Sequence, residues 1–233
     1  MEINSFLRLI ARQDERDVAA MPPCPFDVAS GVSVAIAPCC LWGANLKPTV
    51  DLRGALKYLG LRAIPFVSRT WVLHRASGLR FRVHVRDAVG RTILRHQSYE
   101  PQLTDWLLSA LSQGRAGLFI DVGANIGWFS LHAAGHPRVE RVLAVEPDAG
   151  NLALLQANIE RNGLRGRIEP IGCALGAEAG TARLYQYKPS NRGRHSLIMD
   201  HGRGGSTVPV RCLDELLDAH GLSELPIAAM KVD

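Results

Sequence analysis

Residues 118–130 read LFIDVGANIGWFS, and this stretch decides the fold of the chain around it. It opens with a short apolar run that is typical of a buried strand. Asp121 and two glycines, Gly123 and Gly127, follow, and the apolar residues after them are spaced as on one face of a helix. The pattern predicts a strand, a tight turn and a helix. Such a turn offers free N–H groups at the helix start to a polar or anionic ligand.

Two common ligand-binding turns have this architecture but a different spacing. A dinucleotide-binding turn needs Gly-x-Gly-x-x-Gly, and Asn125 stands where its second glycine should be. A Walker loop ends in Gly-Lys-Ser/Thr, whereas Gly127 is followed by Trp128. The remaining pattern, acid-x-Gly-x-x-x-Gly, resembles motif I of class I S-adenosylmethionine-dependent methyltransferases. In those enzymes the acid faces the amino group of the methionine moiety, and the glycines lie beneath it.

A second acid, Glu146, ends the next predicted strand, residues 141–146. An acid in this place can accept hydrogen bonds from the two vicinal hydroxyls of a ribose. Asp148 is a good N-cap for a helix predicted over residues 149–161, and residues 167–171 are predicted to form a third strand. Because S-adenosylmethionine and NAD both carry a ribose, Glu146 indicates nucleoside binding without choosing between these cofactors.

A set of linked motifs between residues 79 and 233 resembles the FkbM family of methyltransferases. In chain order they are Tyr99-Glu100-Pro101, Phe119 to Gly127, Val145-Glu146-Pro147, Ala174-Leu175-Gly176 with Gly180, Asn191 to Ser196, Val208 to Leu216, and Lys231-Val232-Asp233. The resemblance implies an α/β fold with a Rossmann-like class I methyltransferase sheet in three α/β/α layers. It also implies S-adenosylmethionine as cofactor, and methylation of hydroxyls on sugars, polyketide macrolides and related secondary metabolites.

The same resemblance assigns candidate residues to the parts of the cofactor. The methionine end is expected against Asp121, Gly123, Ala124, Asn125 and Gly127. Glu146, with Pro147 beside it in the same motif, is expected to hold the ribose. The chain at Cys173 and Ala174 is expected to lie against the adenine through its backbone groups.

Four residues outside the glycine turn are further candidates. Tyr99 and Glu100 are candidates to close over the cofactor, although a favourable charge at a helix start explains Glu100 equally well. A hydroxyl acceptor needs a base. Asp233, at the tip of the last predicted strand, is one candidate catalytic base, and His195, in the Gly- and Arg-rich loop 191–196, is the other. An exposed loop histidine without a catalytic role explains His195 as well.

The chain departs from the family pattern at its end. Four core strands of a seven-stranded class I sheet can be placed, near residues 119, 143, 169 and 229, and the family's Lys-x-Asp motif continues where this chain stops at Asp233. We therefore expect a sheet that is incomplete on its C-terminal side, with the edge of the fourth strand exposed. The expected domains are an unassigned N-terminal accessory segment at residues 1–75 and a methyltransferase domain at residues 76–233.

Upstream of the glycine turn, periodicity predicts four further elements. Residues 4–12 and 51–61 have the apolar spacing of amphipathic helices. Residues 81–86 alternate apolar and basic side chains, like a half-exposed strand, and with residues 92–94 they suggest a β-hairpin. Pro101 fits the first turn of a strongly amphipathic helix.

Three functions remain open at this point. The first is S-adenosylmethionine-dependent O-methylation of a sugar, a polyketide or another secondary metabolite. The second is a truncated, catalytically inactive fragment that retains at most S-adenosylmethionine binding. The third is an NAD-linked oxidoreductase, against which Asn125 argues. No His and carboxylate pair stands at metal-ligand spacing, so no metal is predicted.

Composition limits the class of protein and its partners. The 233 residues are 47% hydrophobic and 21% charged, which is typical of a globular chain. The net charge is +5, but the arginines form no basic run, so no nucleic-acid partner is predicted. Five cysteines in no framework favour a reduced, cytoplasmic protein. The apolar run at residues 32–42 is too short to span a bilayer, so no membrane partner is predicted. The predicted partner is a small molecule or glycan with a free hydroxyl.

Overall fold

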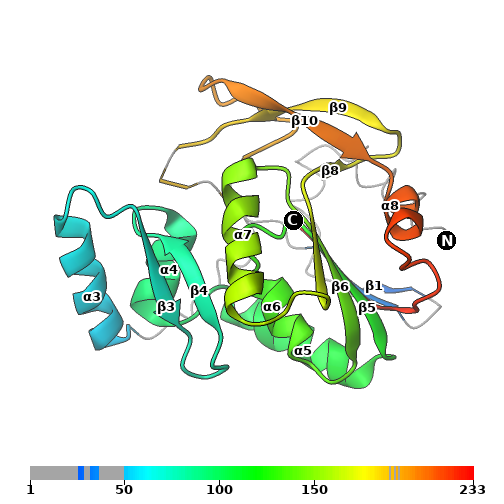
Figure 1. The fold of residues 1–233 in the computed structure, drawn as a ribbon, viewed down its shortest axis with the longest axis horizontal. Helices are drawn as coiled ribbons and strands as arrows, with labels where there is room; N and C mark the ends of the chain where they lie inside the picture. The colour runs from blue at the N-terminus through cyan, green and yellow to red at the C-terminus, as the bar shows by residue number, and fades with distance from the viewer. Residues whose placement is uncertain (1–25, 29–31, 37–49, 189, 192, 194) are drawn as a thin grey trace.

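A six-stranded sheet forms the centre of the molecule, with helices on both of its faces (Figure 1). The computed structural model describes residues 26–28, 32–36, 50–188, 190, 191, 193 and 195–233. The strand order is β1-β2-β11-β5-β6-β7. The strands are β1 (Phe26–Val28), β2 (Val32–Ile36), β5 (Gly117–Val122), β6 (Val139–Val145), β7 (Ile168–Ile171) and β11 (Ile227–Val232). The predicted α/β fold with a Rossmann-like sheet is confirmed.

The four predicted core strands are β5, β6, β7 and β11, and each pairs in parallel with its neighbour among them. Their side chains alternate between the two faces of the sheet. In β5, Leu118 and Ile120 enter one apolar cluster and Phe119 enters the other, and all three are fully buried. Burial on both faces explains why β5 reads as a continuous apolar run in the sequence.

Three helices cover one face of the sheet and a single short helix covers the other. The first three are α5 (Pro101–Gln113), α6 (Trp128–Ala134) and α7 (Ala149–Arg161), and α8 (Leu213–Ala219) packs on the opposite cluster. The helices predicted after Pro101, Gly127 and Asp148 are therefore confirmed. The Asp148 side chain accepts a hydrogen bond from the Asn151 N–H at 2.8 Å and so caps α7. Within the described ranges, no helix combines the length and the apolarity needed to cross a bilayer.

A second, three-stranded sheet lies beyond the carboxyl ends of the core strands, at the top of Figure 1. It contains β8 (Ala174–Leu175), β9 (Gly180–Tyr185) and β10 (Gly205–Arg211), in the order β8-β10-β9. Ala174, Leu184 and Val208 form its small core. The loop between β9 and β10 contains His195, so this sheet determines where one of the predicted catalytic residues lies.

Residues 52–96 form a small unit of their own elements at the left of Figure 1. These are α3 (Leu52–Ala63), β3 (Arg69–Leu73), β4 (Arg80–His84) and α4 (Ala88–His96), and α3 confirms the predicted helix. The predicted hairpin of residues 81–86 with 92–94 is wrong, because β4 pairs with β3 instead. The Asp87 side chain accepts a hydrogen bond from the Val89 N–H at 3.0 Å and starts α4 there. The boundary expected at residue 75 falls in the turn between β3 and β4.

The predicted exposure of the fourth strand is also wrong. β2 pairs in parallel with β11, and β1 continues the sheet as an antiparallel neighbour of β2. A strand from the segment expected to be accessory therefore satisfies the backbone groups along that edge of β11. The helix predicted at residues 4–12 lies outside the described residues.

Candidate cofactor site

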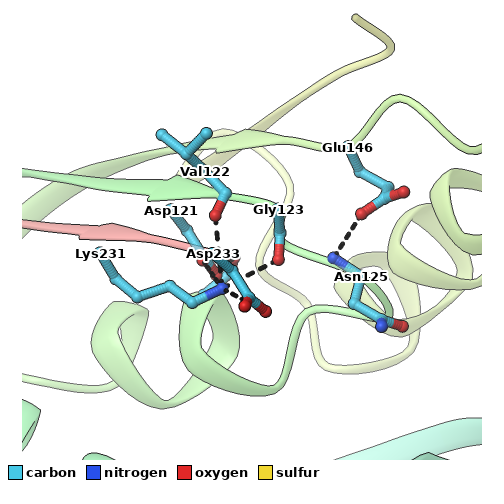
Figure 2. A network of polar contacts seen from close by, with 8 residues as sticks. Asp121, Val122, Gly123, Asn125, Glu146, Lys231 and Asp233 are labelled. Carbon is cyan, nitrogen blue, oxygen red and sulfur yellow. Dashed lines mark hydrogen bonds and ion pairs between the residues drawn. The ribbon is translucent and has the colours of Figure 1, made fainter. Parts of the chain in front are cut away.

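Three of the acids predicted from the sequence lie where the carboxyl ends of β5, β6 and β11 are side by side (Figure 2). Asp121 belongs to β5, Glu146 follows β6, and Asp233 follows β11. Adjacent parallel strands end at the same edge of a sheet, and ligands of open α/β sheets bind at that edge. The fold thus assembles one polar site from three separate stretches of sequence.

The turn after β5 has the backbone geometry that its glycine predicted. Gly123 has a φ of +72°, and Asn125 has a φ of +52°, one of three positive values among the described non-glycine residues. The N–H groups of Gly123 and Ala124 both donate to the Val145 carbonyl at 3.0 Å. A Cβ at position 123 would lie 3.2 Å from the Cβ of Asp233. Glycine there provides the conformation and also the space for the end of β11.

Gly127 serves the packing of two helices. Its φ is +87°, and a Cβ at this position would lie 2.5 Å from Leu155 Cδ1 and 2.8 Å from Leu131 Cδ1. The start of α6 can therefore approach α7 only without a side chain at this residue. The predicted contact of Gly127 with the methionine end of a cofactor stays a prediction.

The Asp121 carboxylate is fully buried at the centre of the site. Its Oδ2 accepts a hydrogen bond from Ser130 Oγ at 2.6 Å, and its Oδ1 lies 3.4 Å from Lys231 Nζ. Among the described residues, no hydrogen bond of good geometry reaches Oδ1. Burial raises the pKa of Asp121, and Lys231 and Ser130 oppose that shift.

Lys231 links β11 to the glycine turn, although no role beyond its place in the last motif was predicted for it. Its Nζ donates to the Gly123 carbonyl at 2.9 Å and to the Val122 carbonyl at 3.3 Å (Figure 2). It also lies 3.5 Å from Asp233 Oδ2. A lysine with only 2% exposure is rare unless it is paired. Its place at the end of the apolar run 227–230 is the sequence signal that could have identified it.

Carboxylates outnumber the ammonium group in this cluster. Burial alone would lower the pKa of Lys231, but Asp233, Asp121 and Glu100 outweigh it, and the pKa is raised. Burial and the nearby charge of Asp233 raise the pKa of Glu100. Three acids therefore surround one fixed cation, so the site as a whole favours a positively charged ligand.

Glu146 forms the second polar centre in Figure 2. Its Oε2 accepts a hydrogen bond from the Asn125 N–H at 2.7 Å, and its Oε1 accepts one from the Asp148 N–H at 2.9 Å. The side chain thus ties the end of β6 to the glycine turn. Burial raises the pKa of Glu146 to about 7, although both N–H donors favour the charged form.

Tyr99 and Glu100 lie where α5 begins, beside the first residues of α6. The Tyr99 ring packs edge-on to Trp128, with ring centroids 6.5 Å apart. Glu100 has a φ of +43°, which is strained for this residue type, and its side chain makes no capping hydrogen bond to α5. Its side chain is close enough to Asp233 and Lys231 for their charges to act on its pKa, so Glu100 belongs to the acidic cluster.

His195 lies near Asp148, not at the end of β11. Its Nδ1 accepts a hydrogen bond from the Tyr187 N–H at 3.0 Å, and its Nε2 lies 3.8 Å from Asp148 Oδ2. In the same loop, a Cβ on Gly193 would lie 3.0 Å from Asn125 Nδ2. The described part of this loop therefore packs over the glycine turn. The two catalytic candidates contact different parts of the site.

Cys173 and Ala174 follow β7, and both are buried. Cys173 is only 2% exposed and belongs to the apolar cluster under α8, while Ala174 belongs to the core of the second sheet. Pro147 is half-buried. Because these small side chains enter apolar clusters, a ligand could use only the backbone groups of Cys173 and Ala174. Among the described residues, no group of three or more His, Cys, Asp or Glu could hold a metal ion.

A comparison with protein families identifies the part of the chain that carries this site. Residues 121–233 match the model of the methyltransferase FkbM domain. This match covers 113 of the 233 residues and includes Asp121, Glu146 and Lys231. The FkbM family is S-adenosylmethionine-dependent. A search of the curated proteins finds no match.

Solved structures with a similar part are methyltransferases of several kinds. A tRNA m1G37 methyltransferase of M. jannaschii is 20% identical, with a TM-score of 0.33 over 45% of this chain and 29% of that one. M. jannaschii TYW2, in complex with AdoMet, is 20% identical, with a TM-score of 0.35 over 45% and 42%. A SAM-dependent methyltransferase from Agrobacterium tumefaciens is 18% identical, with a TM-score of 0.34 over 46% and 33%. The chain spans less than half the length of each, and these scores support no argument about a substrate.

The residues at the sheet edge suit the cofactor of the family. S-adenosylmethionine carries a cationic sulfonium and an ammonium group, and the acidic cluster around Lys231 favours positive charge. The buried Asp121 Oδ1 has no hydrogen-bond donor of good geometry among the described residues, and an ammonium group could supply one. Gly123 is half-buried at this edge, and the Glu146 carboxylate offers oxygens that can accept hydrogen bonds from ribose hydroxyls. The donor set of the FkbM domain therefore fits.

Proposed function

We propose that this chain methylates a hydroxyl group on a sugar, a polyketide or another secondary metabolite. The observation that carries the proposal is the Asp233 carboxylate, which lies at the carboxyl end of β11 beside both Gly123 and Lys231. A neutral hydroxyl is a weak nucleophile, and a carboxylate beside the reacting methyl group can accept its proton. The acceptor is a small molecule or glycan, and the proposed location is the cytoplasm.

We assign the parts of the cofactor to residues as the family resemblance implies. Asp121 and the turn at Gly123, Ala124, Asn125 and Gly127 hold the methionine end, and Glu146, next to Pro147, holds the ribose. The backbone at Cys173 and Ala174 lies against the adenine, and Tyr99 and Glu100 close the site. When bound, S-adenosylmethionine would supply an electrophilic methyl group attached to a positively charged sulfur. The sulfur is the leaving group and becomes a neutral thioether.

The residues of the chain then have two tasks. Asp121, Glu100 and Lys231 fix the charge and the shape of the pocket, so that the acceptor oxygen and the methyl group are aligned. Asp233 accepts the hydroxyl proton while the oxygen forms its new bond to carbon. We favour Asp233 over His195 as base, because both ring nitrogens of His195 face groups at the start of α7 and in its own loop.

The test is product formation with a panel of hydroxylated acceptors. The full chain is incubated with S-adenosylmethionine and each sugar or polyketide, and S-adenosylhomocysteine is quantified. We expect turnover with at least one acceptor, and a loss of about a hundredfold or more in Asp233→Asn with S-adenosylhomocysteine affinity retained. His195→Gln should retain most of the activity. Cofactor binding without turnover on any acceptor would favour the inactive-fragment alternative, and NAD binding in its place would favour an oxidoreductase.

A further inference from the structure

Helix α3 turns an apolar face away from the protein. Gly54 and Tyr58 are buried on its inner side, whereas Leu52, Leu56 and Leu59 are 71%, 61% and 59% exposed. These leucines recur at the spacing of one helix face, opposite the residues that pack on the core. The helix forms the outermost part of the molecule at the left of Figure 1. The helix therefore exposes to solvent the apolar side that an amphipathic helix normally buries.

Residues on either side of the helix enlarge this surface. Phe66 is 86% exposed, Val50 is 54% exposed and Ile64 is 40% exposed. We call these three residues, together with the three leucines, the α3 apolar face. Single exposed apolar residues are ordinary, but six large ones within 17 residues are typical of an interaction surface.

Positive charge is concentrated in the part of the chain that carries the α3 apolar face. Residues 52–86 contain eight Lys or Arg and no Asp or Glu, which exceeds the net charge of +5 of the whole chain. Arg53 and Lys57 lie on one flank of the leucines and Arg62 on the other, and all three are exposed. The acid that precedes the helix, Asp51, caps α3 and pairs with Arg75 at 3.3 Å. An apolar strip with two basic residues on one flank and one on the other is complementary to an anionic, apolar partner.

We propose that the α3 apolar face docks on the surface of an anionic lipid bilayer, with α3 lying in the plane of the interface. The leucines and Phe66 enter the boundary of the acyl chains, while the basic flanks contact the headgroups. A second copy of the chain fits less well, because an isologous contact would bring the arginines of both copies together. A nucleic acid would match the charge but would leave the apolar side chains unmatched. The proposal stands on α3 alone and is independent of the cofactor site.

This inference changes the expectation of a chain without a membrane partner. That expectation rests on the length needed to cross a bilayer, and an interfacial helix has no such requirement. Its apolar side need enter the boundary region only partly. The twelve residues of α3 are enough for such a contact.

The experiment is co-sedimentation of the full chain with vesicles. Vesicles of phosphatidylcholine with about a third phosphatidylglycerol should bind the chain at least about tenfold more strongly than pure phosphatidylcholine vesicles. The double variant Leu56→Gln/Leu59→Gln should lose about tenfold or more of that binding. Ile198→Gln removes an even more exposed apolar residue, at 78%, from the loop between β9 and β10, and this variant should bind like the unchanged chain.

Three outcomes would overturn the proposal. The first is equal binding to neutral and anionic vesicles, or no binding to either. The second is unchanged binding by the double variant, which thermal melting must show to be folded. The third is a chain that does not bind vesicles but instead forms a concentration-dependent dimer or binds an RNA duplex. In that case the double variant would abolish the dimer or the RNA binding.

Discussion

The polar edge of the sheet and the outer face of α3 reverse the usual distribution of residues in opposite ways. At the sheet edge, Asp121 and Lys231 are almost completely buried, although charged groups are costly to remove from water. On α3, Leu52 and Phe66 are largely exposed, although apolar groups are normally covered. In the first region, paired charges and backbone carbonyls compensate for the burial. In the second, nothing in the described part of the chain covers the side chains. A departure from ordinary burial thus indicates a site in both regions, one for a cationic ligand and one for a surface.

The largest expected effect comes from breaking the buried charge cluster. Lys231→Met leaves Asp121 buried without its cation, which should lower the free energy of unfolding by about 3–5 kcal/mol. Arg165→Met is the matched control, because it breaks the exposed ion pair with Glu160. It should change stability by less than about 1 kcal/mol. Urea unfolding of both variants measures the difference, and equal effects would contradict the view that the Lys231 cluster is compensated burial.

The same leucine substitution should separate a core helix from α3. Leu155→Ala on α7 removes a fully buried side chain and should cost about 2–5 kcal/mol of unfolding free energy. Leu56→Ala removes a side chain that is 61% exposed and should cost less than about 1 kcal/mol. Denaturant midpoints of the two variants provide the test. A comparable loss in Leu56→Ala would mean that α3 packs against other residues in solution.

The pH dependence of stability should reveal the buried Glu146. Its pKa is about 7 in the folded chain and near 4.5 in the unfolded chain, so the folded state binds more protons between these values. Stability from this residue is therefore present below about pH 4.5 and is lost as the pH rises towards 7. The unchanged chain should lose on the order of 2 kcal/mol of unfolding free energy through Glu146 between pH 5 and 7, and Glu146→Gln should not show this loss. Parallel pH profiles of the two proteins would show that Glu146 is not perturbed.

The smallest expected effect concerns the backbone of the glycine turn. Asn125→Gly keeps the N–H that donates to Glu146 and suits the positive φ, so stability should change by less than about 0.5 kcal/mol. Asn125→Val places a β-branched residue in this conformation and should cost about 1–2 kcal/mol. Thermal unfolding compares the two, and equal stability would mean that the turn relaxes without strain.

Local patterns in the sequence predicted the core strands β5, β6, β7 and β11 and the helices α5, α6 and α7, but not the strands of the second sheet or α8. The apolar run at Leu118, the N-cap at Asp148 and the glycine at 123 act within a few residues, and the structure places them as expected. The pairing of β2 with β11 was not predictable, because no periodicity says which distant strand will cover an edge. The hairpin prediction for the region after β4 was wrong for a local reason, because the turn-like run at Asp87 starts a helix.

The site was predictable where its residues lie in motifs and not where they meet only in space. Asp121, Glu146 and Asp233 were found from their positions at strand ends. Lys231 was overlooked, because its contacts to the turn join residues more than a hundred positions apart in the sequence. The place of His195 beside Asp148 likewise depends on the loop between β9 and β10, whose path the sequence does not reveal.

The most direct test of the central claim is a calorimetric titration of the full chain with S-adenosylhomocysteine, beside NAD. We expect micromolar affinity for S-adenosylhomocysteine alone, and a loss of at least about tenfold in Asp121→Ala, provided that the variant still melts cooperatively. Such a result would place the cofactor at the buried charge cluster of the sheet edge. Unchanged affinity in a folded Asp121→Ala chain, or binding of NAD instead, would contradict the assignment.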